Sequence, residues 1–381
     1  MRRLPALLLA ALALGACWRA EARVIRVGPG GDFTLPSQAA AAAVDGDIVE
    51  IQAGAYPGDA AVWRANGLTL RGVGEGRARL LSRGATAEGK AIWVIKGRDT
   101  RVEGIEFAGA RVPDGNGAGI RQEGANLVVS RCLFRNNENG ILAGPNPESD
   151  ILVEYSEFAH NGHGDGRTHN LYIGAVRRFT LRFSYSHHAR SGHLVKSRAA
   201  ENHLLYNRLA DEEDGYSSYL IDLPAGGLAF VVGNILHQGA LAENGTMVSY
   251  GAEQILHGDN RLFVVHNTWV NARRTGCRLL SVNHTTEPAW MLNNAFTQCD
   301  VVEGPHQGRG NVSAPAKAYR DLAAYDFRPR AGSPVIDKGA PLAGRVPDAA
   351  LAEREYVHPL ADQPRQNRGR PDAGAYEYAA R

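Results

Sequence analysis

Four polar side chains recur at nearly even intervals through the middle of the chain. Tyr172, Lys196, Asp222 and Ser249 each follow an apolar residue, and Arg198 lies two positions after Lys196. A lysine can act as a base, an arginine can bind a carboxylate through two hydrogen bonds, and a phenol can donate a proton. Together these groups suit proton transfer beside a carboxylate. They can act together only if the fold makes residues from distant parts of the sequence neighbours.

A repeated pattern predicts such a fold. Eight segments share the order apolar, two variable residues, a small or amide residue, one variable residue, and an apolar or aromatic residue. Successive repeats are 23 to 33 residues apart, and short β-branched and aromatic runs alternate with Asn and Gly, as in a solenoid of strands and turns. The fourth position of the pattern holds Ile105, Cys132, Ser156, Ser184, Asn207, Asn234, Asn267 and Asn294.

Stacking explains why amides gather at this position. Coils of a parallel solenoid place equivalent residues roughly 4.8 Å apart, so each Asn can pair with the Asn of the next coil. We call Asn207, Asn234, Asn267 and Asn294 the Asn column. An alanine-rich segment, 37–44, predicts a helix that is capped by Ser37 and covers the first coil. The parallel β-helix is predicted over 23–300, with 301–381 packing back on it as a tail.

Three sequence features resemble the right-handed parallel β-helix proteins of the pectate-lyase type. They are the opening Gly-Asp-x-x-x-Ile-x-x-Gly-x-Tyr from Gly46, the Asn column, and the closing Asp-x-Gly-Ala-Tyr-Glu from Asp372. Segments 191–200, 219–227 and 244–251 resemble a bacterial subset of that superfamily. The resemblance covers nearly the whole chain after residue 22. It implies an all-β, right-handed parallel β-helix and a carbohydrate substrate, but no particular reaction.

Alternation of side chains along a strand predicts which residues face outward. Tyr172, Lys196 and Asp222 then form one outer column, with Asn170 on the same side and His169 and His193 at the strand entrances. The glycine-rich segment 160–167 either walls a binding groove or is a flexible insertion without a role, and the sequence does not decide between these alternatives. The predicted catalytic residues are Lys196, Arg198, Tyr172, His169 and His193, and the predicted substrate-binding residues are Asn170, Asp222, Tyr219 and Ser249.

This set suits β-elimination from an acidic polysaccharide that contains uronate. Arg198 would neutralise the carboxylate at C5, Lys196 would remove the C5 proton, and Tyr172 or His169 would protonate the departing oxygen. Asp222 would orient Lys196, or alternatively hold a calcium ion. No other cofactor and no protein metal site are predicted.

Other functions use the same residues. A mannuronan-type C5-epimerase would return the proton to the opposite face of the sugar, and an envelope glycan-binding protein would perform no chemistry. The Lys196–Asp222 pair is then a solvated cross-strand ion pair. Hydrolysis has weaker support, because inverting hydrolysis needs two carboxylates across the cleft and the outer column offers only Asp222.

The N-terminus predicts export. Residues 1–22 have a basic start, an apolar run and the cleavage signal Ala20-Glu21-Ala22, as in a signal peptide. Alternatively, Cys17 ends a lipobox and is lipidated. The expected location is periplasmic or secreted, with no integral membrane segment.

Charge and cysteine content narrow the partners. The net charge of +2 gives no support for a nucleic-acid partner. A monomer is expected, because a parallel β-helix with capped ends need not oligomerise. Cys277 and Cys299 lie about one repeat apart and can bridge neighbouring coils in an oxidising compartment.

Overall fold

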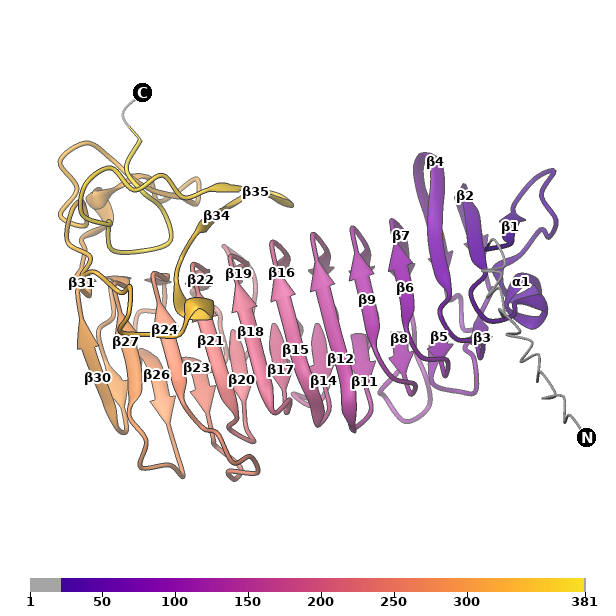
Figure 1. The fold of residues 1–381 in the computed structure, drawn as a ribbon, viewed down its shortest axis with the longest axis horizontal. Helices are drawn as coiled ribbons and strands as arrows, with labels where there is room; N and C mark the ends of the chain where they lie inside the picture. Colours follow the sequence, from indigo (N-terminus) through magenta and orange to yellow (C-terminus); the bar gives the residue numbers. More distant parts are fainter. Residues whose placement is uncertain (1–21, 380–381) are drawn as a thin grey trace, which may run out of the picture.

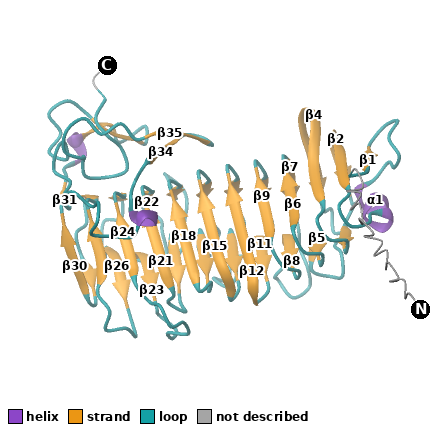
Figure 2. Ribbon diagram, viewed as in Figure 1, coloured by secondary structure: helices purple, strands orange, loops and turns teal. Residues whose placement is uncertain are grey.

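The computed structural model describes residues 22–379, and most of them form one parallel β-helix (Figures 1 and 2). Successive coils lie side by side along the long axis of the molecule. The predicted all-β parallel β-helix is confirmed. The signal peptide, with Cys17 as its alternative lipid site, lies outside the described residues apart from Ala22.

Each complete coil contributes one strand to each of three faces. The first face, called the site sheet below, consists of β3 (Ala61–Trp63), β5 (Ala91–Ile95), β8 (Ala118–Gln122), β11 (Asn139–Ala143), β14 (Leu171–Ile173), β17 (Val195–Ser197), β20 (Ile221–Leu223), β23 (Thr246–Tyr250), β26 (Arg278–Val282) and β29 (Val302–Glu303).

The second face consists of β1 (Val24–Val27), the first halves of β2 (Ile48–Pro57) and β4 (Thr69–Leu81), β6 (Thr100–Glu103), β9 (Leu127–Ser130), β12 (Asn146–Glu154), β15 (Val176–Arg182), β18 (Glu201–Leu205), β21 (Leu228–Val232), β24 (Leu262–Val265), β27 (Ala289–Leu292) and β30 (His306–Arg309). The third face consists of the second halves of β2 and β4, β7 (Ile105–Ala108), β10 (Leu133–Arg135), β13 (Glu157–Ala159), β16 (Tyr185–His187), β19 (Arg208–Ala210), β22 (Ile235–Gln238), β25 (Thr268–Asn271), β28 (Ala295–Thr297) and β31 (Val312–Ser313).

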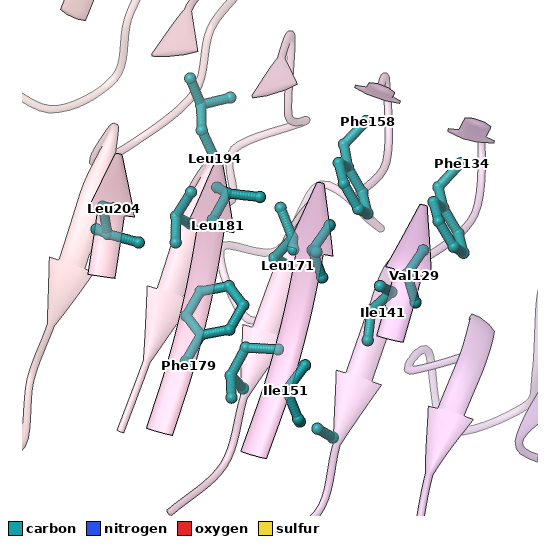
Figure 3. Packing of buried hydrophobic residues seen from close by; sticks show 14 of the residues in the cluster. Val129, Phe134, Ile141, Ile151, Phe158, Leu171, Phe179, Leu181, Leu194 and Leu204 are labelled. Carbon is teal, nitrogen blue, oxygen red and sulfur yellow. The ribbon is translucent and has the colours of Figure 1, made fainter. Parts of the chain in front are cut away.

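The interior is filled by residues that stack from coil to coil. The rings of Phe107, Phe134 and Phe158 stack at centroid distances of 4.9 and 4.8 Å. Ile141 and Leu171, from adjacent strands of the site sheet, are fully buried in the same core (Figure 3). Burying apolar surface on all three faces stabilises the coils against one another.

The Asn column lies at the corner between the second and third faces. Asn207 Nδ2 donates to Asn234 Oδ1 at 3.0 Å, and the same bond at the same distance joins Asn234 to Asn267 and Asn267 to Asn294. Each Oδ1 also accepts the backbone N–H of the preceding Asn at 2.9 Å. All four side chains are fully buried. The predicted column is therefore confirmed as a continuous hydrogen-bond ladder between coils.

Both ends differ from the prediction in detail. The helix α1 (Pro36–Ala42) begins before Ser37, because Pro36 suits the first helical turn and Gln38 Oε1 accepts the N–H groups of Thr34 and Leu35. Parallel strands continue past residue 300 through β29, β30 and β31. This last coil extends the ladder, since Asn294 Nδ2 donates to Asn311 Oδ1 at 3.0 Å, but its short spacing hid it from the repeat pattern.

The remaining segment folds back over parts of the second and third faces, where η2 (Asp348–Ala350) contacts β21 and β24 and Tyr325 contacts Arg208 on β19 (Figure 1). It also contains η1 (Ala316–Ala318), β32 (Tyr319–Asp321), β33 (Asp326–Pro329), β34 (Arg354–Val357) and β35 (Ala361–Pro364). The hairpin of β34 and β35 reaches Tyr155, whose hydroxyl donates to Asp362 Oδ1 at 2.9 Å.

The cysteines separate into one pair and one free thiol within the described residues. Cys277 and Cys299 form a disulfide that joins neighbouring coils, with their Cα atoms 5.9 Å apart. Cys132 occupies the corner position of the Asn column three coils before Asn207, and it is fully buried there. Burial raises the pKa of its thiol to about 12. This thiol therefore packs as a small apolar residue.

Replacing Asn267 with Ala should destabilise the fold strongly. The change removes the acceptor for the Asn234 N–H and the donor to Val231 O, and both groups stay buried. We expect the free energy of unfolding to fall by at least about 2 kcal/mol, measured by urea denaturation. Asn367→Ala, at an exposed position, is the control and should change it by less than about 0.5 kcal/mol. Equal values for the two variants would show that the ladder contributes little.

Candidate functional site

The outer column predicted from the repeats is present on the site sheet. Tyr172 on β14 pairs with Lys196 on β17, Lys196 with Asp222 on β20, and Asp222 with Ser249 on β23. The residue before each of them is fully buried: Leu171, Val195, Ile221 and Val248. The alternation of faces is therefore confirmed at this column, whereas the chemical roles of its members remain predictions.

Lys196 and Asp222 form a nearly dry ion pair. Lys196 Nζ lies 3.1 Å from Asp222 Oδ2, and the two side chains are only 12% and 4% exposed. The pair is thus not the solvated one considered from the sequence. Burial raises the pKa of Asp222, although Lys196 opposes that shift. Its second oxygen, Oδ1, is buried and has no hydrogen-bond partner among the described residues.

Arg198 is held by a carboxylate that sequence reasoning missed. Its Nη1 and Nη2 atoms lie 2.6 and 2.9 Å from the two oxygens of Glu253, and its Nε donates to the Tyr172 hydroxyl at 3.3 Å. Glu253 Oε1 also lies 3.5 Å from Lys196 Nζ. The hydrogen bonds from Arg198 lower the pKa of Glu253, whose side chain is half exposed.

Glu253 belongs to the loop 251–261, which joins β23 to β24 and lies over the site. His257 Nε2 contacts the backbone oxygen of Arg198 at 3.1 Å, which anchors the loop. The sequence carried one signal for it. The interval from Asn234 to Asn267 is the longest in the Asn column, which indicates an inserted loop after β23.

His169 and His193 form a second ladder at the entrance to the strands. Their rings stack at 4.4 Å, His169 Nδ1 accepts the His193 N–H at 2.9 Å, and His193 Nδ1 accepts the Tyr219 N–H at 3.2 Å. These bonds leave Nε2 of each ring to carry the proton. His193 Nε2 lies 3.5 Å from Asp222 Oδ2.

Both imidazoles are neutral at ordinary pH. Burial lowers the pKa of His193 to about 3, with a further contribution from Lys196, and burial also lowers the pKa of His169 well below its usual value. Their side chains therefore act as neutral hydrogen-bond donors rather than as imidazolium acids. Tyr219, half-buried, packs its ring against His193 at 5.0 Å.

The prediction that Asn170 faces outward is wrong. Asn170 is fully buried, and its Nδ2 donates to Ser186 Oγ at 3.0 Å and to the backbone oxygen of His187 at 2.9 Å. It continues an interior amide ladder with Asn161, because β14 begins only at Leu171 and the chain still turns at Asn170. Ser249 pairs with Asp222 on the adjacent strand but is almost fully buried, at 1% exposure.

A groove of about 520 Å³ lies beside the cluster, over β8, β11 and β14. Its floor includes Leu142 and Tyr172, and Arg198 stands at the end nearest Lys196. The segments 114–116 and 165–168, which precede β8 and β14, border the groove at one edge. Gly144, Pro145, Gly174 and Ala175, which follow β11 and β14, border it at the other edge. Of the two alternatives for the glycine-rich segment 160–167, the structure favours the one in which it borders a groove, because Asp165 and Arg167 line it.

The geometry bears on the alternative role of Asp222 as a calcium ligand. Among residues 22–379, no three His, Cys, Asp or Glu side chains are grouped so that they can hold a metal ion. Asp222 Oδ2, the ligand atom considered from the sequence, instead contacts Lys196. The alternative in which Asp222 orients Lys196 fits this geometry better.

No protein-family model and no curated protein matches the chain. By structure, the chain is similar to the pectate lyase Pel9A, with a TM-score of 0.60 and 14% identity over 94% of this chain and 97% of that one. A pectin methylesterase from Aspergillus niger gives a TM-score of 0.35 at 11% identity over 77% of this chain and 91% of that one, too low to support an argument. The first likeness shows the fold, a pectate-lyase-like parallel β-helix. In the described part of the chain, no helix has the length and apolar character needed to cross a membrane.

The neutral histidines predict a pH dependence of stability. An unfolded histidine binds a proton near pH 6.5, whereas folded His193 binds one only near pH 3. Stability should therefore fall as the pH is lowered from about 6.5 toward 3. His193→Asn should reduce this slope, because Asn does not titrate and can accept the Tyr219 N–H, just as Asn139 Oδ1 accepts the His169 N–H at 2.9 Å. Urea denaturation at several pH values tests this. An unchanged slope in the variant would contradict it.

Proposed function

We propose that the chain is a polysaccharide lyase that cleaves an acidic, uronate-containing glycan by β-elimination. The observation that carries the proposal is the clustering of Lys196, Arg198 and Tyr172 at the end of an open groove. The Nζ atom of Lys196 lies 5.7 Å from the centre of the Tyr172 ring, and Arg198 Nε contacts the Tyr172 hydroxyl. A base, a carboxylate receptor and a proton donor thus converge on one small area.

Glu253 marks where a substrate carboxylate would bind. Its two oxygens meet the planar fork of Arg198 in the geometry that guanidinium groups form with carboxylates. Because the Glu253 side chain is half exposed, its pairing with Arg198 is weak enough to exchange. A uronate would replace Glu253 on Arg198 and thereby place its C5 carbon near Lys196. Neutralising the carboxylate makes the C5 proton easier to remove.

Lys196 must lose a proton before it can act as a base. Asp222 is suited to accept it, because Asp222 Oδ2 lies 3.1 Å from Nζ and burial raises the pKa of Asp222. A buried ion pair is costly, and proton transfer turns it into a neutral pair. Lys196 then takes the C5 proton, and the electron pair of the C–H bond forms the C4–C5 double bond as the C4–O bond breaks.

Tyr172 is the better donor to the departing oxygen. Its hydroxyl oxygen accepts a hydrogen bond from Arg198, which leaves the O–H free to donate and stabilises the phenolate that results. Lys196 then returns a proton to Tyr172, and Asp222 returns its proton to Lys196, which restores the starting state. His169 is less suited, since it is neutral and only 2% exposed.

A second candidate is a glycan-binding protein without catalysis. It is favoured by the two carboxylates around Lys196, because Asp222 and Glu253 both stabilise the ammonium form. Alginate, pectate, glucuronan and bacterial exopolysaccharides should be screened for ultraviolet absorbance of an unsaturated product and for new reducing ends. Both signals together support the lyase. Reducing ends alone indicate hydrolysis, an altered uronate ratio alone indicates an epimerase, and binding alone indicates the second candidate.

Lys196→Ala should lower the rate of product formation by at least about a hundredfold, because it removes the base. Lys338→Ala is the control, since Lys338 is exposed in the C-terminal segment and does not line the groove. The measurement is the rate of absorbance increase on the polymer found in the screen. A rate within twofold of wild type for Lys196→Ala would exclude Lys196 as the base.

Glu253→Ala should strengthen binding of uronate roughly two- to fivefold, because it removes the carboxylate that competes for Arg198. Glu287→Ala, on an exposed neighbouring loop, serves as the control. The dissociation constant for an oligouronate, measured by calorimetry, decides the matter. Weaker binding by Glu253→Ala would mean that Glu253 positions Arg198 and does not stand in the substrate's place.

A further inference from the structure

The groove continues the same outer column that carries Lys196. Arg121 on β8 pairs with Leu142 on β11, and Leu142 pairs with Tyr172 on β14. Arg121 is thus three strand spacings from Lys196, roughly 14 Å along the solenoid axis. A ligand that lies along the groove runs from Arg198 toward Arg121.

Two arginines of the groove lack a close carboxylate. Arg121 Nε is buried without a hydrogen-bond partner among residues 22–379, and its nearest carboxylate oxygen, Glu123 Oε1, is 3.8 Å away. That oxygen already accepts a hydrogen bond from Lys90 at 2.7 Å. Arg167, in the segment that precedes β14, also lines the groove, is exposed, and forms no ion pair within the described part of the chain. By contrast, Arg198 is fully engaged by Glu253.

The rest of the groove suits a sugar. Leu142 and Pro145 offer apolar surface for the C–H face of a ring, and Asp114 and Asp165 at the rim can accept hydrogen bonds from hydroxyl groups. Its volume of about 520 Å³ lies in the range of ligand-binding pockets. Together, two under-paired guanidinium groups and a sugar-sized space fit an anionic saccharide.

We propose that this groove is a second carboxylate-binding site. Arg121 and Arg167 bind one uronate of the glycan there, while Arg198 holds another uronate of the same glycan. The inference rests on the proposed function and narrows its substrate to glycans with several uronates close together. An isolated uronate among neutral sugars would use Arg198 alone and bind more weakly.

The opposite direction offers an anionic chain no under-paired cation within the described residues. Beyond Asp222 the column continues with the buried Ser249 and Ser281 and then with Glu303, whose carboxylate is paired with Arg278 at 2.9 Å. Glu253 lies between the Lys196 cluster and these strands. The acidic glycan therefore extends from the Lys196 cluster toward β8 and not toward β29.

Binding of oligouronates tests the inference. Tetramers of galacturonate, guluronate and mannuronate are titrated by calorimetry into full-length Lys196→Ala protein, in which cleavage is blocked. In the same background, Arg121→Ala and Arg167→Ala should each weaken tetramer binding by about tenfold and leave monomer binding unchanged. Arg177→Ala, which removes an exposed arginine from the second face, should have no effect.

Two further ligands identify the chemistry. Cellotetraose, which is uncharged, should bind weakly and equally to all variants. A sulfated neutral tetramer that binds more tightly than every uronate tetramer would overturn the carboxylate assignment. Unchanged tetramer binding in both Arg121→Ala and Arg167→Ala would overturn the site itself, as would failure of every uronate tetramer to bind.

The outcomes also separate this inference from the proposed function. If the wild-type protein forms an unsaturated product but the arginine variants keep wild-type affinity for tetramers, the function stands and the second site fails. If no polymer yields product but tetramer binding still depends on Arg121 and Arg167, the site stands and the lyase proposal fails.

Discussion

Register between neighbouring coils is the constraint on which the rest of this molecule depends. Each Asn of the column gives its oxygen to the N–H of the preceding coil and its amide hydrogens to carbonyl groups inside the corner, so every coil fixes the next one. A slip by one residue would turn each side chain of a strand to the other face. Lys196 and Asp222 would then point into the core, and Val195 and Ile221 would face solvent. The ladder at one corner therefore determines which side chains the site sheet presents.

The candidate site combines two carboxylates of opposite character around one lysine. Asp222 comes from a strand, is buried, and cannot leave, whereas Glu253 comes from a loop and is half exposed. Desolvation makes the first a proton acceptor, and exposure makes the second exchangeable. A rigid sheet thus carries the reactive pair, and a loop carries the group that yields to a ligand. This division is common where binding requires a replaceable internal partner.

The sequence predicted correctly the outward positions within the repeated strands. Its predictions failed for residues in the corners and loops between those strands. Tyr172, Lys196 and Asp222 were placed correctly because strand alternation and coil spacing are both regular there. Asn170 was misplaced because β14 has three residues and the corner precedes it. Leu194 and Leu220 occupy the position of Asn170 in the next two coils, and both are apolar and fully buried. Their apolar character could have indicated that this position faces the interior. Glu253 had no periodic partner, so only the tertiary fold brings it to Arg198.

The returning C-terminal segment changes how this stack of coils can come apart. In a simple solenoid each coil touches only its neighbours, so the last coil can fray without disturbing distant ones. Here Tyr206 in the middle of the helix donates to the backbone oxygen of Leu351 at 3.3 Å, and Tyr155 is bound by Asp362. Peeling of the final coil must therefore break contacts several coils away. The tail thus cross-links distant coils, which makes unfolding of the C-terminal half cooperative. The strands of the candidate site lie between the cross-linked coils.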